Sequence, residues 1–233
     1  MTELSHGAPR GGVVVLISGR GSNLQAIIDA VHAGQVPAEL RAVISSEPGT
    51  PGLARARTAG LPTHVINFRD FSAREDFYRA LMQQIDAYQP RLVALAGFMR
   101  ILGKNFIDHY AGRLLNIHPS LLPEFPGLDT HARALRSGTK YHGASVHFVT
   151  PEVDGGPVII QAVIPVVPDD SPETLAERVL NQEHRIYPLA IRWFLEGRLT
   201  IDDGRVLLDG QPRPEQGLFQ RESTPGDVPA GPS

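Results

Sequence analysis

Asn116 and His118 stand two residues apart in the stretch NIHPSLLP, directly after the apolar pair Leu114-Leu115. Residues i and i+2 of a strand point to the same side, so the amide and the imidazole should face one way. Pro119 has no N–H for a sheet ladder and should end the strand there. An amide donor beside an imidazole can stabilise a carbonyl oxygen that gains negative charge. The simpler alternative to a catalytic role is that these polar side chains lie at a strand end and are solvated by water.

A carboxylate that could serve this pair is Asp154, in the segment VTPEVDGGPVI at residues 149–159. An acid before two glycines is usually only a turn residue. Beside the end of the strand that carries His118, it could orient the imidazole and favour the charged ring. Asn116, His118 and Asp154 would then form a set suited to acyl transfer to an amine without a covalent nucleophile. Glu152 and Asp154 could also form a pair of carboxylates for acid–base chemistry. A turn whose side chains meet solvent is the more ordinary interpretation of these two residues.

The other histidines carry less weight. His147 lies in an alternating run and is expected to serve packing. No HExxH or similar ligand spacing occurs, so we expect no metal site. The histidines without such ligand spacing are His64, His109, His131, His142 and His184.

A glycine-rich turn, Gly19-Arg20-Gly21-Ser22-Asn23, lies between the first expected strand and the first expected helix. In an open parallel sheet ligands bind at the carboxyl ends of the strands, and a helix start offers free N–H groups to an anion. Leu24 replaces the glycine of a dinucleotide fingerprint, and no P-loop lysine is present. The turn therefore predicts a phosphate monoester site, or else a tight turn that needs glycine for geometry alone.

The elements that must position these residues alternate along the chain. Strand-like runs are expected at 13–17, 40–45, 63–68, 91–96 and 114–118, with helical stretches between most of them, which indicates a parallel sheet. Ser72 and Glu75 have capping-box spacing. After residue 140, runs at 141–149 and 158–166 suggest added antiparallel strands. A long helix follows, with Ser171 as N-cap and Pro172 at its first position, and then a short strand near residue 206. We expect an α/β fold with an open, mostly parallel twisted sheet and helices on both faces, Rossmann-like.

Composition narrows the class of protein. The chain has 233 residues, 42% of them hydrophobic and 20% charged, with a net charge of −3 and no cysteine. These values give no electrostatic footprint for nucleic acid or an anionic membrane, and they exclude disulfides and thiol nucleophiles. No apolar run approaches a membrane span, and the polar N-terminus lacks the apolar centre of a signal peptide, so we expect a cytoplasmic protein. We expect one domain at 13–217, a flexible extension at 1–12, and a disordered Pro-, Gly- and Ser-rich tail at 218–233.

Five segments together resemble the phosphoribosylglycinamide formyltransferases of the single-domain bacterial type. They are LISGRGSNLQAIIDA, LAGFMRIL, NIHPSLLPEFPG, HGASVHFVTPEVDGGPVI and QEHRIYPLAIRWF. The resemblance runs from about Val13 to Gly217. Each motif alone is moderately specific, whereas five in order at family spacing are highly specific.

The resemblance implies a folate-dependent one-carbon transfer of purine biosynthesis. The amine of glycinamide ribonucleotide would attack the formyl carbon of 10-formyltetrahydrofolate, the co-substrate, without a metal. The residues that match the family's catalytic set are Asn116, His118 and Asp154. Those that would bind the ribonucleotide are Gly21, Ser22, Asn23 and Glu183. Those that would contact the folate are Arg74, Met99, Arg100, Ile101, Leu102, Asn116, Thr150, Pro151, Glu152, Val153 and Asp154. Ser145 would lie in the strand beside the site.

The chain departs from the family at Asp129 and Glu124, where relatives often carry histidine and a basic or small residue. This makes the loop more acidic and puts folate affinity or loop mobility in question. The resemblance also implies a cis bond between Leu122 and Pro123, and a monomer or weak homodimer.

Three other functions stay open. Formylation of methionyl-tRNA would need an RNA-binding C-terminal domain. A formyltetrahydrofolate hydrolase would normally carry an extra N-terminal domain, yet only twelve residues precede the first expected strand. A non-catalytic nucleotide-binding module would not require Asn116, His118 and Asp154.

Overall fold

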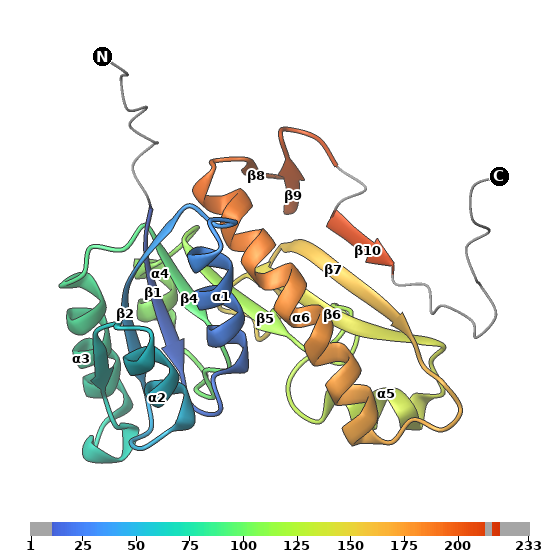
Figure 1. Ribbon diagram of the computed structural model, residues 1–233, viewed down its shortest axis with the longest axis horizontal. Helices are drawn as coiled ribbons and strands as arrows, with labels where there is room; N and C mark the ends of the chain where they lie inside the picture. The colour runs from blue at the N-terminus through green and yellow to red at the C-terminus, as the bar shows by residue number, and fades with distance from the viewer. Residues whose placement is uncertain (1–10, 213–215, 220–233) are drawn as a thin grey trace.

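The structure is a computed structural model that describes residues 11–212 and 216–219. Within these residues one sheet contains eight strands in the order β10-β7-β6-β5-β4-β1-β2-β3 (Figure 1). The strands are β1 (Gly11–Ile17), β2 (Ala38–Ser45), β3 (Thr63–Val65), β4 (Leu92–Leu95), β5 (Leu114–His118), β6 (Tyr141–Phe148), β7 (Val158–Pro165) and β10 (Gly217–Phe219). A separate two-stranded sheet pairs β8 (Leu199–Asp202) with β9 (Arg205–Leu208).

The main sheet is mostly parallel. β1 pairs in parallel with β2 and β4, β4 with β5, β2 with β3, and β10 with β7. Only β6 runs against both of its neighbours, β5 and β7. The expected α/β class and the antiparallel additions in the second half are therefore confirmed.

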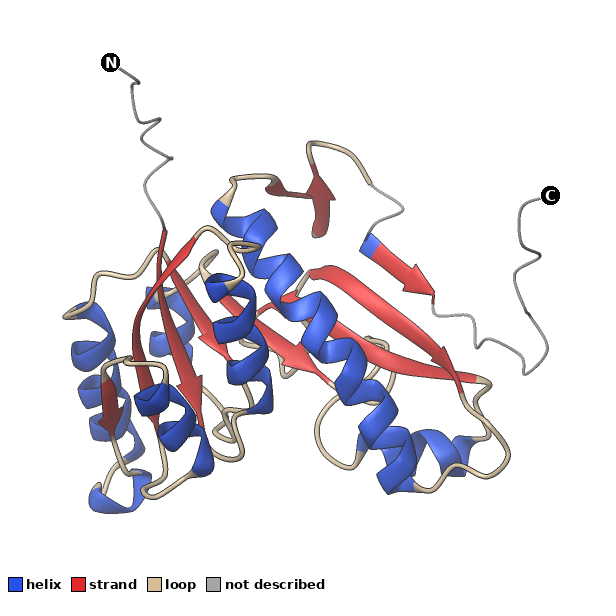
Figure 2. Ribbon diagram, in the orientation of Figure 1, coloured by secondary structure: helices blue, strands red, loops and turns tan. Residues whose placement is uncertain are grey.

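Helices cover both faces of this sheet (Figures 1 and 2). They are α1 (Ser22–His32), α2 (Pro51–Thr58), α3 (Arg74–Asp86), α4 (Lys104–His109), α5 (Thr130–Ser137) and α6 (Pro172–Leu195), with a 3₁₀ turn at Phe68–Asp70. Val13, Val15 and Ile17 pack toward α1 and α6, whereas Val14 and Leu16 pack toward α3 and α4. A strand buried on both faces explains the continuous apolar run at the start of the chain.

The ends of the expected domain differ from the structure. Gly11 and Gly12 already pair with β2, so the expected extension at 1–12 is two residues too long. Gly217–Phe219 pairs with β7, so the expected boundary at 217 falls inside β10. A pair of glycines and a three-residue segment are each too short to show a strand period, so these boundaries were not predicted from the sequence. The rest of the expected extension and tail, residues 1–10 and 220–233, lies outside the described residues.

Helix starts were predicted with mixed success. Ser171 caps α6, where its hydroxyl accepts from the N–H of Thr174 and forms a full capping box, and Pro172 begins the helix. The capping box expected at Ser72 is wrong, because α3 begins at Arg74 after Ala73, which makes no side-chain cap. The expected strand at 63–68 ends at Val65, since the Asn67 side chain accepts from the N–H of Arg69 and starts the 3₁₀ turn.

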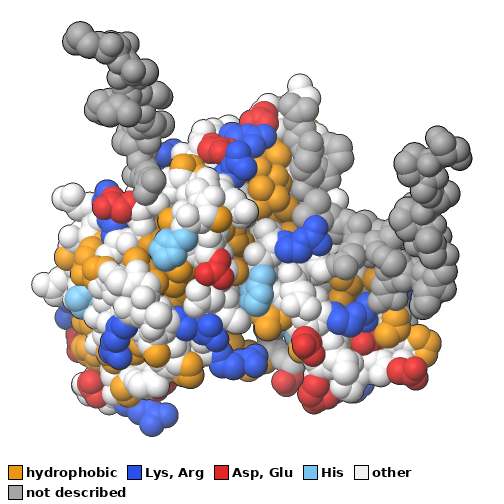
Figure 3. Space-filling view, viewed as in Figure 1, with side chains coloured by type: hydrophobic (Ala, Val, Ile, Leu, Met, Phe, Trp, Pro, Cys, Tyr) orange, Lys and Arg blue, Asp and Glu red, His pale blue; other side chains and the backbone are white. Residues whose placement is uncertain are grey.

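Two further features of the described residues bear on function. None of their helices is both long enough and apolar enough to cross a membrane. They also contain no cluster of three or more side chains placed to ligate a metal ion. Charged side chains of both signs are scattered over the face shown in Figure 3.

Candidate active site

The end of β5 carries two of the predicted catalytic residues. Strand β5 covers Leu114–His118, as expected, and Asn116 is half-buried while His118 is only 6% exposed. In the antiparallel register with β6, Asn116 stands opposite His147 and His118 opposite Ser145. The plainer reading of a wet strand end is therefore wrong for His118, which is a buried polar side chain.

Asp154 approaches His118 from the loop between β6 and β7. The Nδ1 atom of His118 lies 3.4 Å from Oδ2 of Asp154, and its Nε2 atom lies 3.0 Å from the carbonyl oxygen of Phe125. A carboxylate and a carbonyl oxygen both accept hydrogen bonds, so each ring nitrogen of His118 faces an acceptor. The structure thus brings together Asn116, His118 and Asp154, which we call the catalytic trio.

His147 is a member of this cluster that the sequence reading missed. Its Nδ1 atom donates to the carbonyl oxygen of Phe148 at 2.9 Å, so in the neutral ring Nε2 is an acceptor, and Nδ2 of Asn116 lies 3.2 Å from it. Oδ1 of Asp154 lies 3.7 Å from the same Nε2 atom. Burial lowers the pKa of His147, which favours the neutral ring. His147 therefore orients the Asn116 amide, a role that only the pairing of β5 with β6 reveals.

The turn that follows β5 is held by side chains of β6 and β7. The Ser145 hydroxyl donates to the carbonyl oxygen of Ser120 at 2.6 Å and accepts from the N–H of Leu122 at 3.0 Å. The Gln161 amide donates to the carbonyl oxygen of Leu122 at 2.9 Å and to Ser145 Oγ at 2.8 Å. The Leu122–Pro123 bond is cis, as expected. This network fixes the backbone that follows His118.

The loop with the acidic departures continues from this turn. Gly127 donates its N–H to Oδ2 of Asp154 at 2.8 Å, so the loop contacts the catalytic trio directly. The Glu124 side chain is exposed, and its backbone carbonyl accepts from the Ser120 hydroxyl at 2.6 Å. Asp129 is exposed, has a positive φ of 56°, and precedes α5 without a side-chain cap. The two departures thus lie on the outer side of this loop.

The glycine-rich turn connects β1 to α1, as expected. Gly21 has φ 73° and a Cβ added to it would come within 2.6 Å of Gly52 Cα, so glycine is required here by backbone geometry. Gly19, by contrast, faces open space within 4 Å. Glycine is thus required by geometry at Gly21, while Gly19 has open space beside it; we call residues 19–23 the phosphate turn after the ligand predicted from the sequence.

Asn23 and Glu183 bring α1 and α6 together at this turn. Nδ2 of Asn23 donates to Oε2 of Glu183 at 2.6 Å, and the two side chains are 8% and 7% exposed. Burial raises the pKa of Glu183. Among the described residues Oδ1 of Asn23 has no hydrogen-bond partner although it is buried. An unmatched acceptor beside a carboxyl group is a place where a ligand hydroxyl or amine can bind.

Most of the predicted folate contacts lie on two loops, whereas Arg74 begins α3 and Asn116 is on β5. Met99, Ile101 and Val153 are 69%, 67% and 56% exposed, which is unusual for large apolar side chains. They belong to residues 99–102, which we call the folate segment, and to the loop at 149–157. Ligand-binding surfaces commonly expose such side chains.

The two arginines predicted near the folate are held by the protein. Arg74 and Tyr78 both donate to the carbonyl oxygen of Ile101. Arg100 forms an ion pair with Glu47, and its guanidinium lies 4.6 Å from the centroid of the Phe68 ring. Both arginines therefore support the folate segment or its neighbour loop in the structure itself.

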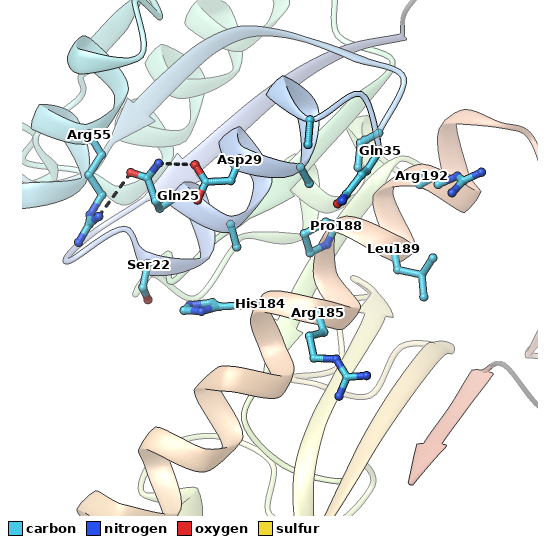
Figure 4. A pocket seen from close by; sticks show the side chains of 14 residues that line it. Ser22, Gln25, Asp29, Gln35, Arg55, His184, Arg185, Pro188, Leu189 and Arg192 are labelled. Carbon is cyan, nitrogen blue, oxygen red and sulfur yellow. Dashed lines mark hydrogen bonds between the residues drawn. The ribbon is translucent and has the colours of Figure 1, made fainter. Parts of the chain in front are cut away.

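A groove of about 950 Å³ runs between α1 and α6 (Figure 4). It reaches the phosphate turn at Ser22, where His184 of α6 also lines the groove. Arg55 lines it and donates to the carbonyl oxygen of Arg20 at 3.1 Å, which brings positive charge to this corner. None of the catalytic trio lines this groove. The groove therefore borders the phosphate turn but lies apart from the reacting groups.

Comparisons with known proteins agree with this arrangement. A sequence model described as Formyl transferase matches residues 12–191. The phosphoribosylglycinamide formyltransferase of Escherichia coli K12 is 56% identical over 210 residues, which are 90% of this chain and 99% of that protein. The corresponding protein of Haemophilus influenzae is 45% identical and covers 88% of this chain and 97% of its own length.

Solved structures give the same result. The phosphoribosylglycinamide formyltransferase of Coxiella burnetii has a TM-score of 0.84 at 51% identity and covers 89% of this chain and 98% of its own. The formyltetrahydrofolate deformylase of Pseudomonas syringae has a TM-score of 0.81 at 26% identity, covering 86% of this chain and 66% of its own. This chain belongs to the phosphoribosylglycinamide formyltransferase family.

Proposed function

We propose that this chain is the formyltransferase that moves the formyl group of 10-formyltetrahydrofolate to the amine of 5'-phosphoribosylglycinamide in purine biosynthesis. Family membership supports the reaction, since its full-length relatives carry the name of this activity. The observation that carries the mechanism is the catalytic trio, in which a buried imidazole lies 3.4 Å from a carboxylate beside an oriented amide. Phosphate binding alone requires none of these groups.

The chemistry assigned to the trio is direct attack. The amine nitrogen bonds to the formyl carbon, and the formyl oxygen becomes an oxyanion in the tetrahedral intermediate. The second N–H of the Asn116 amide and the His118 ring donate to this oxygen. In that step the formyl oxygen takes the place of the Phe125 carbonyl, the present partner of His118 Nε2. Collapse of the intermediate breaks the bond from carbon to N10 of the folate.

One proton must move for each turnover. The attacking amine loses a proton and N10 of the folate gains one, so the reaction needs a base that later acts as an acid. Asp154 is placed for this role, directly or through a water, because its side chain is 12% exposed and reaches both His118 and His147. The Asp154 carboxylate also orients the His118 ring towards the oxyanion through its 3.4 Å contact with Nδ1.

The substrates are assigned to the two groups of loops. We place the phosphate at Gly21, Ser22 and Asn23 and the glycinamide or ribose end at Glu183. The open space at Gly19 supports the phosphate placement, and the unmatched Asn23 Oδ1, an acceptor, supports the hydroxyl or amine of the glycinamide or ribose end. We place the folate along Arg74, the folate segment and residues 150–154, where three large apolar side chains are exposed. Both groups of loops follow strands of the sheet, as ligand sites do in open α/β folds.

A hydrolase is the second candidate, because a deformylase of similar fold covers 86% of this chain. In that reaction water would replace the amine as the nucleophile, and no phosphorylated substrate would bind at the phosphate turn. Asn23 and Glu183, buried together at this turn, offer acceptors to the amine or a hydroxyl of an acceptor substrate, which hydrolysis does not need.

The test is turnover of 10-formyltetrahydrofolate with and without glycinamide ribonucleotide, with the His118→Ala variant as a blank. We expect formylated ribonucleotide to form in step with tetrahydrofolate, and little release in water alone. Equal release of formate with and without the ribonucleotide would refute the transferase and establish the hydrolase.

We also propose a monomer or weak homodimer that works in the cytoplasm and binds no nucleic acid. A net charge of −3 supports the last point. Sedimentation velocity across a range of concentrations tests the oligomeric state. The proposed domain is residues 11–219, which includes the paired ends of β1 and β10.

A further inference from the structure

Ser18 follows β1 and immediately precedes the phosphate turn. Its backbone N–H donates to the carbonyl oxygen of Gly97 at 3.0 Å, and its hydroxyl oxygen accepts from the N–H of Met99 at 2.9 Å. The last paired residues of β1 and β4 are Leu16 and Leu95, so these two bonds extend the contact beyond both strands. The first residue of the folate segment is therefore fastened to the residue from which the phosphate turn departs.

The same hydroxyl also reaches the loop after β2. Oγ of Ser18 lies 2.7 Å from Oγ of Ser46, which is 1% exposed. The N–H of Ser46 donates to the carbonyl oxygen of Ile17 at 3.1 Å. The next residue, Glu47, forms the ion pair with Arg100 of the folate segment. Three loops that follow three adjacent strands thus meet at one hydroxyl group.

The hydrogen bonds leave this hydroxyl little freedom. A serine hydroxyl has one hydrogen to donate and two lone pairs that accept. The Met99 amide uses one lone pair and Ser46 takes a second contact, so displacement of either loop disturbs the bond to the other. The Met99 side chain is 69% exposed although its backbone N–H is bound, so a ligand that contacts Met99 contacts the end of this linkage.

We propose that the Ser18 hydroxyl is a positioning group that couples the two substrate sites. Ordering of the phosphate turn around the ribonucleotide holds the folate segment in its binding position, and bound folate does the same for the phosphate turn. Coupling of this kind is reciprocal, because each ligand must change the affinity for the other by the same factor. The inference rests on the proposed function, which places the two substrates at these loops.

Coupling can be separated from a purely structural role. A serine that only stabilised the fold would, when replaced, change the melting temperature or weaken both ligands in proportion. It would not change the ratio between the ribonucleotide Kd measured without folate and that measured with folate. This ratio is the quantity that the proposal concerns.

The experiment is calorimetric titration of glycinamide ribonucleotide, alone and with saturating tetrahydrofolate, which carries no formyl group and so cannot react. In the unaltered chain we expect tighter binding in the presence of the folate. Ser18→Ala should reduce the ratio of the two Kd values about two- to tenfold, the effect of losing one or two hydrogen bonds. Ser18→Thr keeps a hydroxyl and should retain most of the ratio. Ser137→Ala is the matched control, since its hydroxyl bonds only within the end of α5, to the Ala134 carbonyl at 2.7 Å.

Each result decides the question. A ratio of one in the unaltered chain, or an unchanged ratio in Ser18→Ala, overturns the coupling and leaves the proposed function standing. A chain that binds neither ligand overturns both. If Ser18→Ala does not fold, Ser46→Ala removes only the contact with the β2 loop, and it must lower the ratio for the proposal to hold.

Discussion

Replacing Asp154 by asparagine isolates the charge of the carboxylate in the catalytic trio. Asp154 has φ 52°, a left-handed conformation that asparagine tolerates better than most residues. The side-chain oxygen of asparagine can still accept the Gly127 N–H, which now lies 2.8 Å from Oδ2. The variant therefore keeps the backbone and the loop contact, and what it loses is the negative charge beside His118.

The size of the effect follows from the geometry. The His118 and Asp154 side chains are 7% and 12% exposed, so solvent screens their interaction little. Two unit charges 3.4 Å apart attract by about 5 kcal/mol at an effective dielectric constant of about 20, which is an upper bound for a full charge. Asparagine keeps a dipole in the same place, so we take the loss to be about 3 kcal/mol, below that bound and similar in size to the effect of removing one oxyanion donor. We therefore expect kcat to fall about 10²-fold or more.

The assay is steady-state kinetics across pH, with KM measured for both substrates. The KM for the ribonucleotide should change little, while the pH–rate profile should shift because the imidazole loses its charged partner. Asp129→Asn is the matched control: it makes the same chemical change at φ 56° on an exposed side chain of the loop between β5 and α5. The double variant His118→Ala/Asp154→Asn should cost much less than the sum of the two logarithmic losses, since the residues act as a unit. The reasoning is refuted by near-normal kcat in Asp154→Asn, by full additivity, or by an equal loss in Asp129→Asn.

Three further predictions concern stability. Gln161→Leu removes the donors to the Leu122 carbonyl and to Ser145 Oγ, so the free energy of unfolding in urea should fall by about 1–3 kcal/mol; an unchanged value contradicts the role assigned to this network. Burial raises the pKa of Glu183, so the native protein loses stability as the pH rises through that pKa. Glu183→Gln should therefore melt at a higher temperature than the unaltered chain at pH 8, with a gap that closes towards pH 4; a gap that widens there is the contrary result. Burial lowers the pKa of His142 to about 4 from 6.5, so up to roughly 3 kcal/mol of stability is lost as the pH falls through this range. His142→Gln should lose less over the same range in urea titrations, and an identical pH dependence counts against this explanation.

The parts of the site that local sequence determines were predicted well. Strand β5 was expected at 114–118 and occupies those residues, because an apolar pair, an alternating amide and imidazole, and a proline stop are all local signals. The phosphate turn was expected between β1 and α1 for the same reason. Helical stretches were expected between most of these strands, but α2, α4 and α5 were not located individually, since six to eight residues hold too few turns to show a helical period.

The parts that depend on contacts between distant segments were not predicted. His147 was expected to serve packing because its strand alternates, yet its partner Asn116 lies 31 residues earlier and is met only through the β5–β6 register. The clash that would meet a side chain at Gly21 comes from Gly52, which is on α2. Neither relation leaves a mark within a short window of sequence.

The register of β6 places His147 beside the catalytic trio. A slip of one residue would turn every side chain of the strand to the other face and place Val146 or Phe148 opposite Asn116. The loop that carries Asp154 must also lie close to this strand. Gly156 makes this possible, because a Cβ at that position would come 1.8 Å from the Phe148 carbonyl oxygen. The pair Gly155-Gly156 was read from the sequence only as a turn, but the second glycine allows the loop to pack against β6 and so brings the Asp154 carboxylate within reach of both histidines.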